Sequence, residues 1–173
     1  MQKTKQVASI KEKHNYALTI DNDIYEVENV VFEITSRLTQ FFSAKEIFNI
    51  SLGLSELVTN AVEHGNLEVS YDEKTQFLQD GTYFEELERR SHTEPYKSRK
   101  VVINYTLDRN ELKFVIKDDG SGFDWRNLPS PKSILSECHG RGITITRHYF
   151  DGIAFNDIGN EVTLIKKVTN EKK

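Results

Sequence analysis

The stretch SAKEIFNISLGLSELVTNAVEHGN, residues 43–66, decides the fold because it has the pattern of one long helix with a single apolar face. Ser43 followed three residues later by Glu46 is the pattern in which each side chain satisfies the other's free backbone N–H at the start of a helix. Gly65-Asn66 supplies the stop, because residues that tolerate positive φ end a helix at little cost. We therefore expect a helix from about Ala44 to His64 whose apolar side covers a sheet. The apolar arc comprises Ile47, Ile50, Leu54, Leu57, Val58 and Ala61.

The sequence on either side of this helix supplies the sheet and more helices. Two alternating apolar stretches around a turn at Asp108-Arg109-Asn110 are typical of a β-hairpin. Helices early in the chain and mostly antiparallel strands later predict an α+β fold, a two-layer α/β sandwich. Its sheet should be mixed, mostly antiparallel, and covered by helices on one face. Strands are predicted at 16–20, 101–107, 112–116, 153–155 and 162–165, and further helices over 24–42 and from about 142.

Residues 67–98 differ from the rest of the chain. They are dense in charge and carry only a scattered apolar stripe, which includes Phe77, Leu78 and Leu87. We interpret them as an inserted helical hairpin that turns near Asp80-Gly81. Two roles stay open for this insert: a surface that binds a partner, or a layer that covers the domain.

Composition narrows the class of protein. The chain has 173 residues, 23 Lys and Arg against 27 Asp and Glu, and a net charge of −4. This mild acidity gives no reason to expect direct binding to nucleic acid or to an anionic membrane. The single cysteine, Cys138, cannot form an internal disulfide. We expect one domain over 1–173 in a cytoplasmic protein.

A polar arc on the long helix is the first candidate for chemistry. Glu56 and Asn60 are four residues apart and so lie one above the other, and Glu63 and His64 fall in the same arc. One interpretation is a solvated polar face. The other is a site where Asn60 gives an oxygen to a hard cation and Glu56 acts as a general base on water or a hydroxyl group.

Two glycine-rich segments are the next candidates. Asp118-Asp119-Gly120-Ser121-Gly122 follows a strand, so a flat ligand could approach the backbone while Asp118 accepts a hydrogen bond. The alternative is a common turn. Gly140-Arg141-Gly142 precedes a helix, where free N–H groups and a cation could bind an anion. The alternative there is a flexible start of a helix whose arginine points into water.

Taken together and in this order, the three segments resemble the ATP-binding domain of the histidine kinase-like (GHKL) ATPases. This superfamily includes histidine kinases, type II topoisomerases, a heat-shock chaperone and mismatch-repair ATPases. The stretch Glu56–Ala61 resembles its N-box, Asp118–Gly122 its Asp-x-Gly-x-Gly box, and Gly140–Gly142 its Gly-x-Gly box. The stretch Glu56–His64 looks most like the bacterial anti-sigma-factor serine kinases. The resemblance implies the Bergerat ATP-binding fold.

The resemblance also implies a role for each matching residue. Asp118 would hydrogen-bond the adenine amino group, Asn60 would coordinate Mg²⁺ at the phosphates, and Glu56 would be the catalytic base. Residues 123–139 would form the lid over ATP. The glycines and the arginine implied to contact the nucleotide are Gly120, Gly122, Gly140, Arg141 and Gly142. Where many members have Gly-Thr before the last strand, this chain has Gly159-Asn160, which puts one adenine contact in question.

By the same resemblance, the protein would be a Mg-ATP-dependent serine/threonine kinase that switches partners. It would hold a sigma factor in one state and phosphorylate a STAS-type anti-sigma-factor antagonist in another. Close relatives commonly pair, so a homodimer is among the expected assemblies. Two alternatives stay open: a nucleotide-dependent binding module without kinase turnover, and a slow ATPase.

Overall fold

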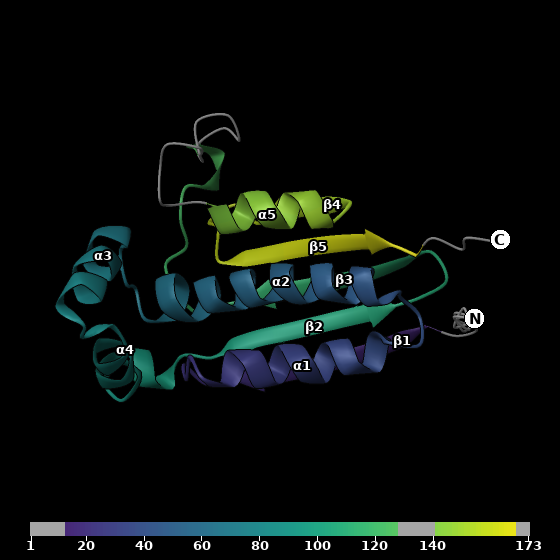
Figure 1. Ribbon diagram of the computed structural model, residues 1–173. Coiled ribbons are helices and arrows are strands. Elements are labelled where there is room, and N and C mark those ends of the chain that lie inside the picture. The colour runs from purple at the N-terminus through teal and green to yellow at the C-terminus, as the bar shows by residue number, and fades with distance from the viewer. Residues whose placement is uncertain (1–12, 128–140, 169–173) are drawn as a thin grey trace.

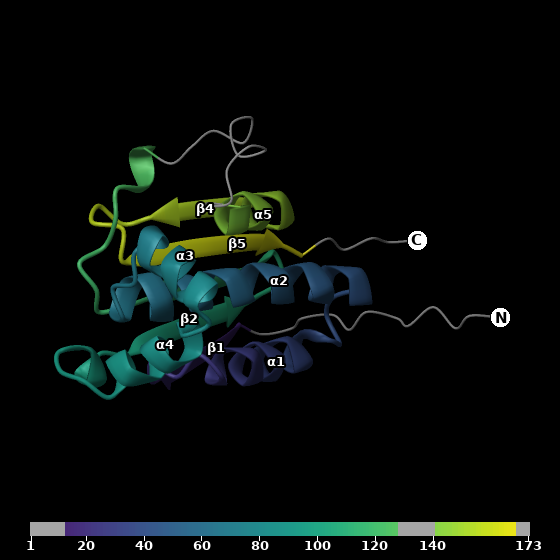
Figure 2. The same cartoon turned by 60° about the vertical axis from the view of Figure 1, so that its left-hand side comes forward.

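A single antiparallel sheet carries helices on one face in the computed structural model, which describes residues 13–127 and 141–168 (Figure 1). The helices α1, α2 and α5 lie side by side over the sheet, while α3 and α4 project at one end (Figures 1 and 2). The described elements are β1 (His14–Ile20), α1 (Glu26–Leu38), α2 (Ala44–Asn60), a π-helix (Ala61–Asn66), α3 (Tyr71–Asp80), α4 (Tyr83–Ser91), a 3-10 turn (Tyr96–Ser98), β2 (Val101–Leu107), β3 (Glu111–Lys117), a 3-10 turn (Trp125–Asn127), α5 (Arg141–Tyr149), β4 (Gly152–Phe155) and β5 (Glu161–Lys167).

The sheet has the strand order β1-β2-β3-β5-β4, and each of these four pairings is antiparallel. In the centre, Tyr105 pairs with Phe114, which pairs in turn with Leu164. Alternate residues of β2 are buried, as expected for a sheet with one covered face. The α+β two-layer sandwich is therefore confirmed. The sheet is more uniform than the mixed one that we expected, since no parallel pair occurs in the described strands.

The core lies between this sheet and the apolar faces of α1 and α2. The expected capping box starts α2: the Glu46 N–H donates to Ser43 Oγ at 3.3 Å, and the Ser43 N–H donates to Glu46 Oε2 at 2.8 Å. None of the helices in the described ranges is long and apolar enough to cross a membrane. Fully or almost fully buried core residues include Val31, Ile34, Leu38, Ile50, Leu54, Val58, Ile103, Phe114 and Leu164.

The end of α2 differs from the prediction. Regular α-helix ends at Asn60, and the next six residues form a π-helix in which the Leu67 N–H donates to the Val62 carbonyl at 2.9 Å. A bond to the fifth residue back widens the turn and changes the direction of the side chains that follow. Glu63 is fully buried and its carboxylate contacts Lys74 of α3, whereas Glu56 is exposed. Our placement of Glu63 on the same polar face as Glu56 was wrong for this reason.

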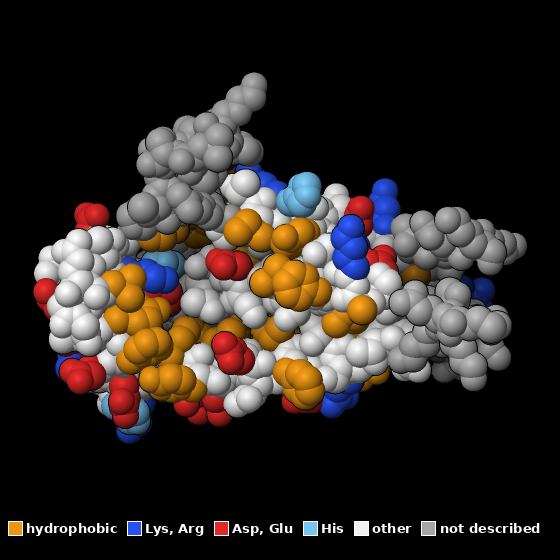
Figure 3. Space-filling model, viewed as in Figure 1, with side chains coloured by type: hydrophobic (Ala, Val, Ile, Leu, Met, Phe, Trp, Pro, Cys, Tyr) orange, Lys and Arg blue, Asp and Glu red, His pale blue; other side chains and the backbone are white. Residues whose placement is uncertain are grey.

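Residues 67–98, called the insert from here on, contain the predicted helical hairpin. α3 and α4 are joined at Gly81, whose φ of 72° is in the left-handed region. A second capping box, Ser70 with Glu73, starts α3. Apolar side chains gather at this end of the molecule (Figure 3), where the exposed ones of α3 and α4 are Tyr71, Leu78 and Phe84.

Candidate functional site

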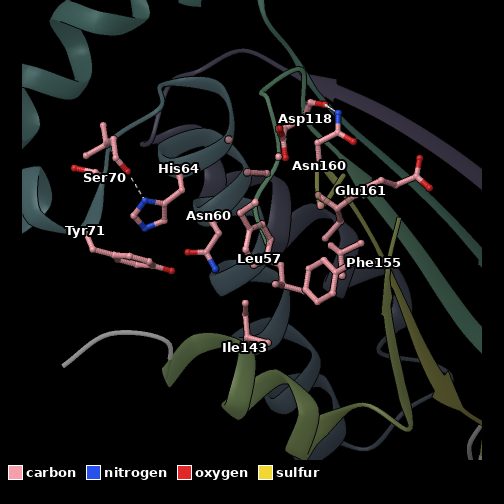
Figure 4. Close-up of a pocket in the computed structure, with 18 residues that line it drawn as sticks. Leu57, Asn60, His64, Ser70, Tyr71, Asp118, Ile143, Phe155, Asn160 and Glu161 are labelled. Atoms are coloured by element: carbon pink, nitrogen blue, oxygen red, sulfur yellow. Dashed lines mark hydrogen bonds between the residues drawn. The ribbon is translucent and has the colours of Figure 1, made fainter. Parts of the chain in front are cut away.

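A cavity of about 260 Å³ lies where the end of α2, the start of α5, the ends of β3 and β4, the start of β5 and the start of the insert meet (Figure 4). Most of its wall is apolar, and polar groups are placed at a few positions. A slot of this kind suits a flat ring system that hydrogen-bonds at its edge. The apolar wall includes Leu57, Ile116, Ile143, Phe155 and Val162, and the polar positions include Asn60, His64, Tyr71, Asp118 and Asn160.

Asp118 is the buried acceptor of the cavity. It follows directly after β3 and is 8% exposed. Its Oδ1 accepts a hydrogen bond from the Gly120 N–H at 2.9 Å, and no other residue in the described part of the chain donates to this carboxylate. Burial raises the pKa of Asp118 to about 6, the nearby charge of Asp119 adds to the rise, and Arg99 opposes it. Such a carboxylate has an acceptor ready for an amino group on a ligand.

Asp119 faces away from the cavity, as expected for neighbours at a strand end. Its Oδ2 accepts from the Lys100 N–H at 2.9 Å, and its own N–H donates to Asn66 Oδ1 at 2.8 Å. The structure therefore places Asp118, and not Asp119, at the cavity.

The predicted glycines are positions of close backbone approach. A Cβ on Gly120 would lie 2.2 Å from the Gly65 carbonyl oxygen, and one on Gly65 would lie 2.5 Å from Asp118 Cγ. Gly122 has a φ of +80°, and a Cβ there would lie 2.0 Å from the Ile158 carbonyl oxygen. We expected these glycines to admit a ligand. Close contacts within the protein already require them, and of Gly120 and Gly122 only Gly122 lines the cavity.

Asn60 and Glu56 lie near the start of α5. The Asn60 amide points into the cavity (Figure 4) and has no hydrogen-bond partner among the described residues. Glu56, one turn earlier, is exposed, and a Cβ on Gly142 would lie 2.1 Å from its Oε2. Gly142 precedes Ile143, which lines the cavity, so Glu56 lies beside the cavity wall.

Two predicted residues cannot be placed in the same way. Gly140 lies outside the described residues, as does most of the proposed lid, residues 123–139. Arg141 is the first residue of α5, and the structure describes its backbone alone. The structure brings together Glu56, Asn60, Asp118, Gly122 and Gly142.

Sequence reasoning missed much of the wall. Part of the wall consists of apolar residues: Ile143, Phe155 and Val162. Their local sequence is the same as that of hydrophobic core positions, so it does not show that they line a cavity. Tyr71 and Ser70 come from the insert, which we did not place beside the site. The Ser70-x-x-Glu73 capping pattern was the available signal, since it starts a helix only five residues after Gly65.

Asn160, which stands where many related domains have threonine, is engaged within the protein. Its Nδ2 donates to the Asp118 carbonyl at 3.2 Å, and its Oδ1 accepts from Asn156 Nδ2 at 2.7 Å. Asn160 thus fixes the backbone of Asp118 and also lines the cavity.

The cavity has the features of a nucleotide site. It is an apolar slot with the buried acceptor Asp118 on one side. On the other side lie the Asn60 amide (Figure 4) and, beside the wall, the Glu56 carboxylate, where the phosphates of a nucleotide would extend from the slot. In comparison with known families, residues 21–166 match the histidine kinase-like ATPase domain. This range covers most of the chain and includes the insert. The chain therefore belongs to the histidine kinase-like ATPase domain family, which implies that it binds ATP. A comparison with curated proteins gave no match.

Proposed function

We propose that this protein is a Mg-ATP-dependent serine/threonine kinase of the anti-sigma-factor type. In one state it holds a sigma factor, and in another it phosphorylates a STAS-type antagonist of that interaction. The observation that carries the proposal is the exposed Glu56 carboxylate, which lies against Gly142 and one turn from the cavity residue Asn60. A base in this position is accessible to a hydroxyl group on another protein.

Different residues of the cavity bind the adenine base and the metal ion. Asp118 accepts a hydrogen bond from the adenine amino group, and the apolar walls at Leu57 and Ile143 enclose the base. The Asn60 oxygen suits Mg²⁺, which prefers oxygen ligands and takes many of them from phosphates and water. The described residues contain no cluster of three or more Asp, Glu, His or Cys side chains that could hold a metal ion. Asn60, which points into the cavity (Figure 4), is the ligand that we propose. The bound ion supplies charge neutralisation at the phosphates.

Glu56 carries the chemical role. Phosphoryl transfer depends mainly on positioning and on charge stabilisation, so the protein needs one group that orients the attacking hydroxyl and accepts its proton. General bases of this kind contribute about 10²- to 10⁴-fold to rates. Glu56 is exposed, and it is the carboxylate that lies beside Gly142 at the start of α5.

Two substitutions separate binding from transfer. Glu56→Gln should keep ATP affinity and lower phosphate transfer at least about 10²-fold, because only the base is lost. Asp118→Asn should abolish ATP binding, because an amide can present an N–H where the adenine amino group donates. The measurements are calorimetry with ATP and Mg²⁺, and transfer from radiolabelled ATP to a purified STAS-type antagonist. If no serine or threonine of any antagonist becomes labelled by the wild-type protein, the kinase proposal fails.

A nucleotide-dependent binding module is the second candidate, favoured by the contact between the insert and the cavity at Ser70 and Tyr71. In that case ATP would bind with the same dependence on Asp118, and no phosphate would move to a protein or to water. Release of inorganic phosphate without an acceptor protein would instead indicate a slow ATPase.

A further inference from the structure

The insert supplies part of the wall of the ATP cavity. Val69 and Ser70 lead into α3, and Tyr71 is its first residue. Figure 4 shows the Tyr71 ring reaching toward the part of the cavity that Asn60 enters, while Asp118 lies on the other side. Since Asp118 marks the adenine end, Tyr71 lies toward the end where phosphates would be.

We propose that Tyr71 binds the phosphate chain of ATP through its hydroxyl group, and that the buried carboxylate of Glu63 holds Tyr71 in place. The insert is then a working part of the nucleotide site and not only a covering layer. This inference rests on the proposed function in that its ligand is a nucleotide.

The surroundings of Tyr71 suit a donor to an anion. One side of its ring packs against the His64 imidazole, with centroids 4.5 Å apart, and 44% of the residue stays exposed. Partial burial and the negative charge of Glu63 raise the pKa of Tyr71 above its usual value. The hydroxyl therefore keeps its proton at neutral pH, and a hydrogen bond from it to a charged phosphate oxygen is of the stronger kind.

Glu63 fixes the insert to the end of the site helix. It is fully buried, with Lys74 Nζ at 2.7 Å from its Oε2 and Tyr83 Oη donating to its Oε1 at 3.0 Å. The Glu63 carboxylate, three residues after Asn60, thus contacts both α3 and α4 and fixes their position. α3 has no fully buried side chain, so this polar tie is a main determinant of where Tyr71 lies.

In the alternative role, Tyr71 only packs against the His64 ring and makes no contact with the ligand. Binding measurements with two ligands separate these roles, because adenosine has the base and sugar of ATP but lacks the phosphates. The full chain is titrated with ATP and Mg²⁺, and separately with adenosine. Phe84→Ala is the matched control, since Phe84 is an aromatic residue of the same insert, is 54% exposed and does not line the cavity.

Tyr71→Phe and Tyr71→Ala should each weaken ATP binding by about tenfold, the value expected for loss of a hydrogen bond to a charged group. Adenosine affinity should stay within about twofold of wild type, and Phe84→Ala should change neither affinity. Tyr71→Phe keeps the ring against His64, so it carries the test if Tyr71→Ala does not fold. Equal ATP affinity in wild type and Tyr71→Phe, or an equal loss for adenosine, overturns the inference.

The role of Glu63 is tested by a double-mutant cycle. Glu63→Gln should weaken ATP binding but not adenosine binding, and adding it to Tyr71→Phe should cause no further loss, since both changes act on one contact. Additive losses would overturn the positioning role. Failure of the wild-type chain to bind ATP at all would instead overturn the proposed function, which distinguishes the two proposals.

Discussion

One buried carboxylate lies in the sandwich and another lies where the π-helix at the end of α2 meets the insert, and the two are used in opposite ways. Asp118, in the sandwich, accepts one hydrogen bond from the Gly120 backbone and faces a cavity. Glu63 has both oxygens engaged, by Lys74 and by Tyr83. A buried acceptor with spare capacity is ready for a ligand, whereas one that the protein satisfies completely is structural.

The two regions also differ in what holds them together. α1 and α2 bury continuous apolar faces against the sheet, but α3 buries no side chain fully and α4 buries only Leu87. Besides the buried side chains of Leu67 and Val69, the insert is attached by polar contacts: in addition to the Glu63 side-chain contacts, Asn22 Nδ2 donates to the Tyr96 carbonyl at 2.7 Å. We therefore expect the insert to open without unfolding of the sandwich.

The largest effect is expected for Glu63→Ala. Removing one partner of a buried ion pair costs about 3–5 kcal/mol, because Lys74 loses the charge that compensates it. Hydrogen exchange by mass spectrometry should show that amides of 71–91 lose protection while those of β2 and β3 keep theirs.

Leu54→Ala is the matching change in the sandwich. Truncation of this fully buried side chain costs about 2–5 kcal/mol and should lower protection across the sheet as well as the insert. If Glu63→Ala lowers protection of β2 and β3 as much as Leu54→Ala does, the two regions unfold together and the contrast is wrong.

A smaller effect is expected from the pH dependence of Asp118. If Asp118 accepts the adenine amino group as proposed, binding requires the ionised carboxylate, and burial raises the pKa of Asp118 to about 6. Adenosine affinity should thus be constant above about pH 7 and about tenfold weaker near pH 5. Adenosine is the suitable ligand because it has no phosphate that titrates in this range, and equilibrium dialysis measures its binding.

The same group affects folding in the opposite direction. Because the folded state holds this proton more tightly than the unfolded chain, the contribution of Asp118 to stability is present below about pH 4 and lost as the pH rises through 6. Adenosine binding that stays constant down to about pH 5 would show that Asp118 is not the adenine acceptor.

The smallest effects are expected for the two capping boxes. Ser43→Ala and Ser70→Ala remove the same motif, at a cost of about 1 kcal/mol each. In urea denaturation, Ser43→Ala should lower the global free energy of unfolding by this amount. Ser70→Ala should leave it unchanged and raise only the exchange of amides 71–80. Equal shifts in urea for both variants would make the insert part of one cooperative unit.

Much of the fold could be predicted because its signals are local. Ser43 and Glu46 marked the start of α2, the turn at residues 108–110 marked the hairpin of β2 and β3, and Gly81 marked the turn of the insert. Asn60 and Asp118 could be named as candidates from their places on a helix face and at a strand end, but a solvated polar face and a common turn explained those places equally well, and the resemblance to a family decided between them. Their meeting at one cavity followed from the family resemblance.

The remainder depends on contacts that local sequence does not encode. The π-helix at 61–66 has no signal in the local sequence, and Glu63 within it is buried against Lys74 of the insert and not exposed in the predicted polar arc. Tyr71 lies seven residues after His64, and only the path of the chain through Val69 returns it to that ring. No periodicity in the sequence predicts the contact of Glu63 with the insert or that of Tyr71 with His64.

The π-helix at residues 61–66 has a consequence for how such a protein can diverge. Because its turn is wider than that of an α-helix, the side chains after it point in directions that the α-helix before it does not set. Extra chain beyond residue 66 can therefore be gained, shortened or exchanged without rotating Asn60 out of the cavity. A change in the chain beyond this segment would alter the Tyr71 side of the cavity and leave the Asn60 side in place.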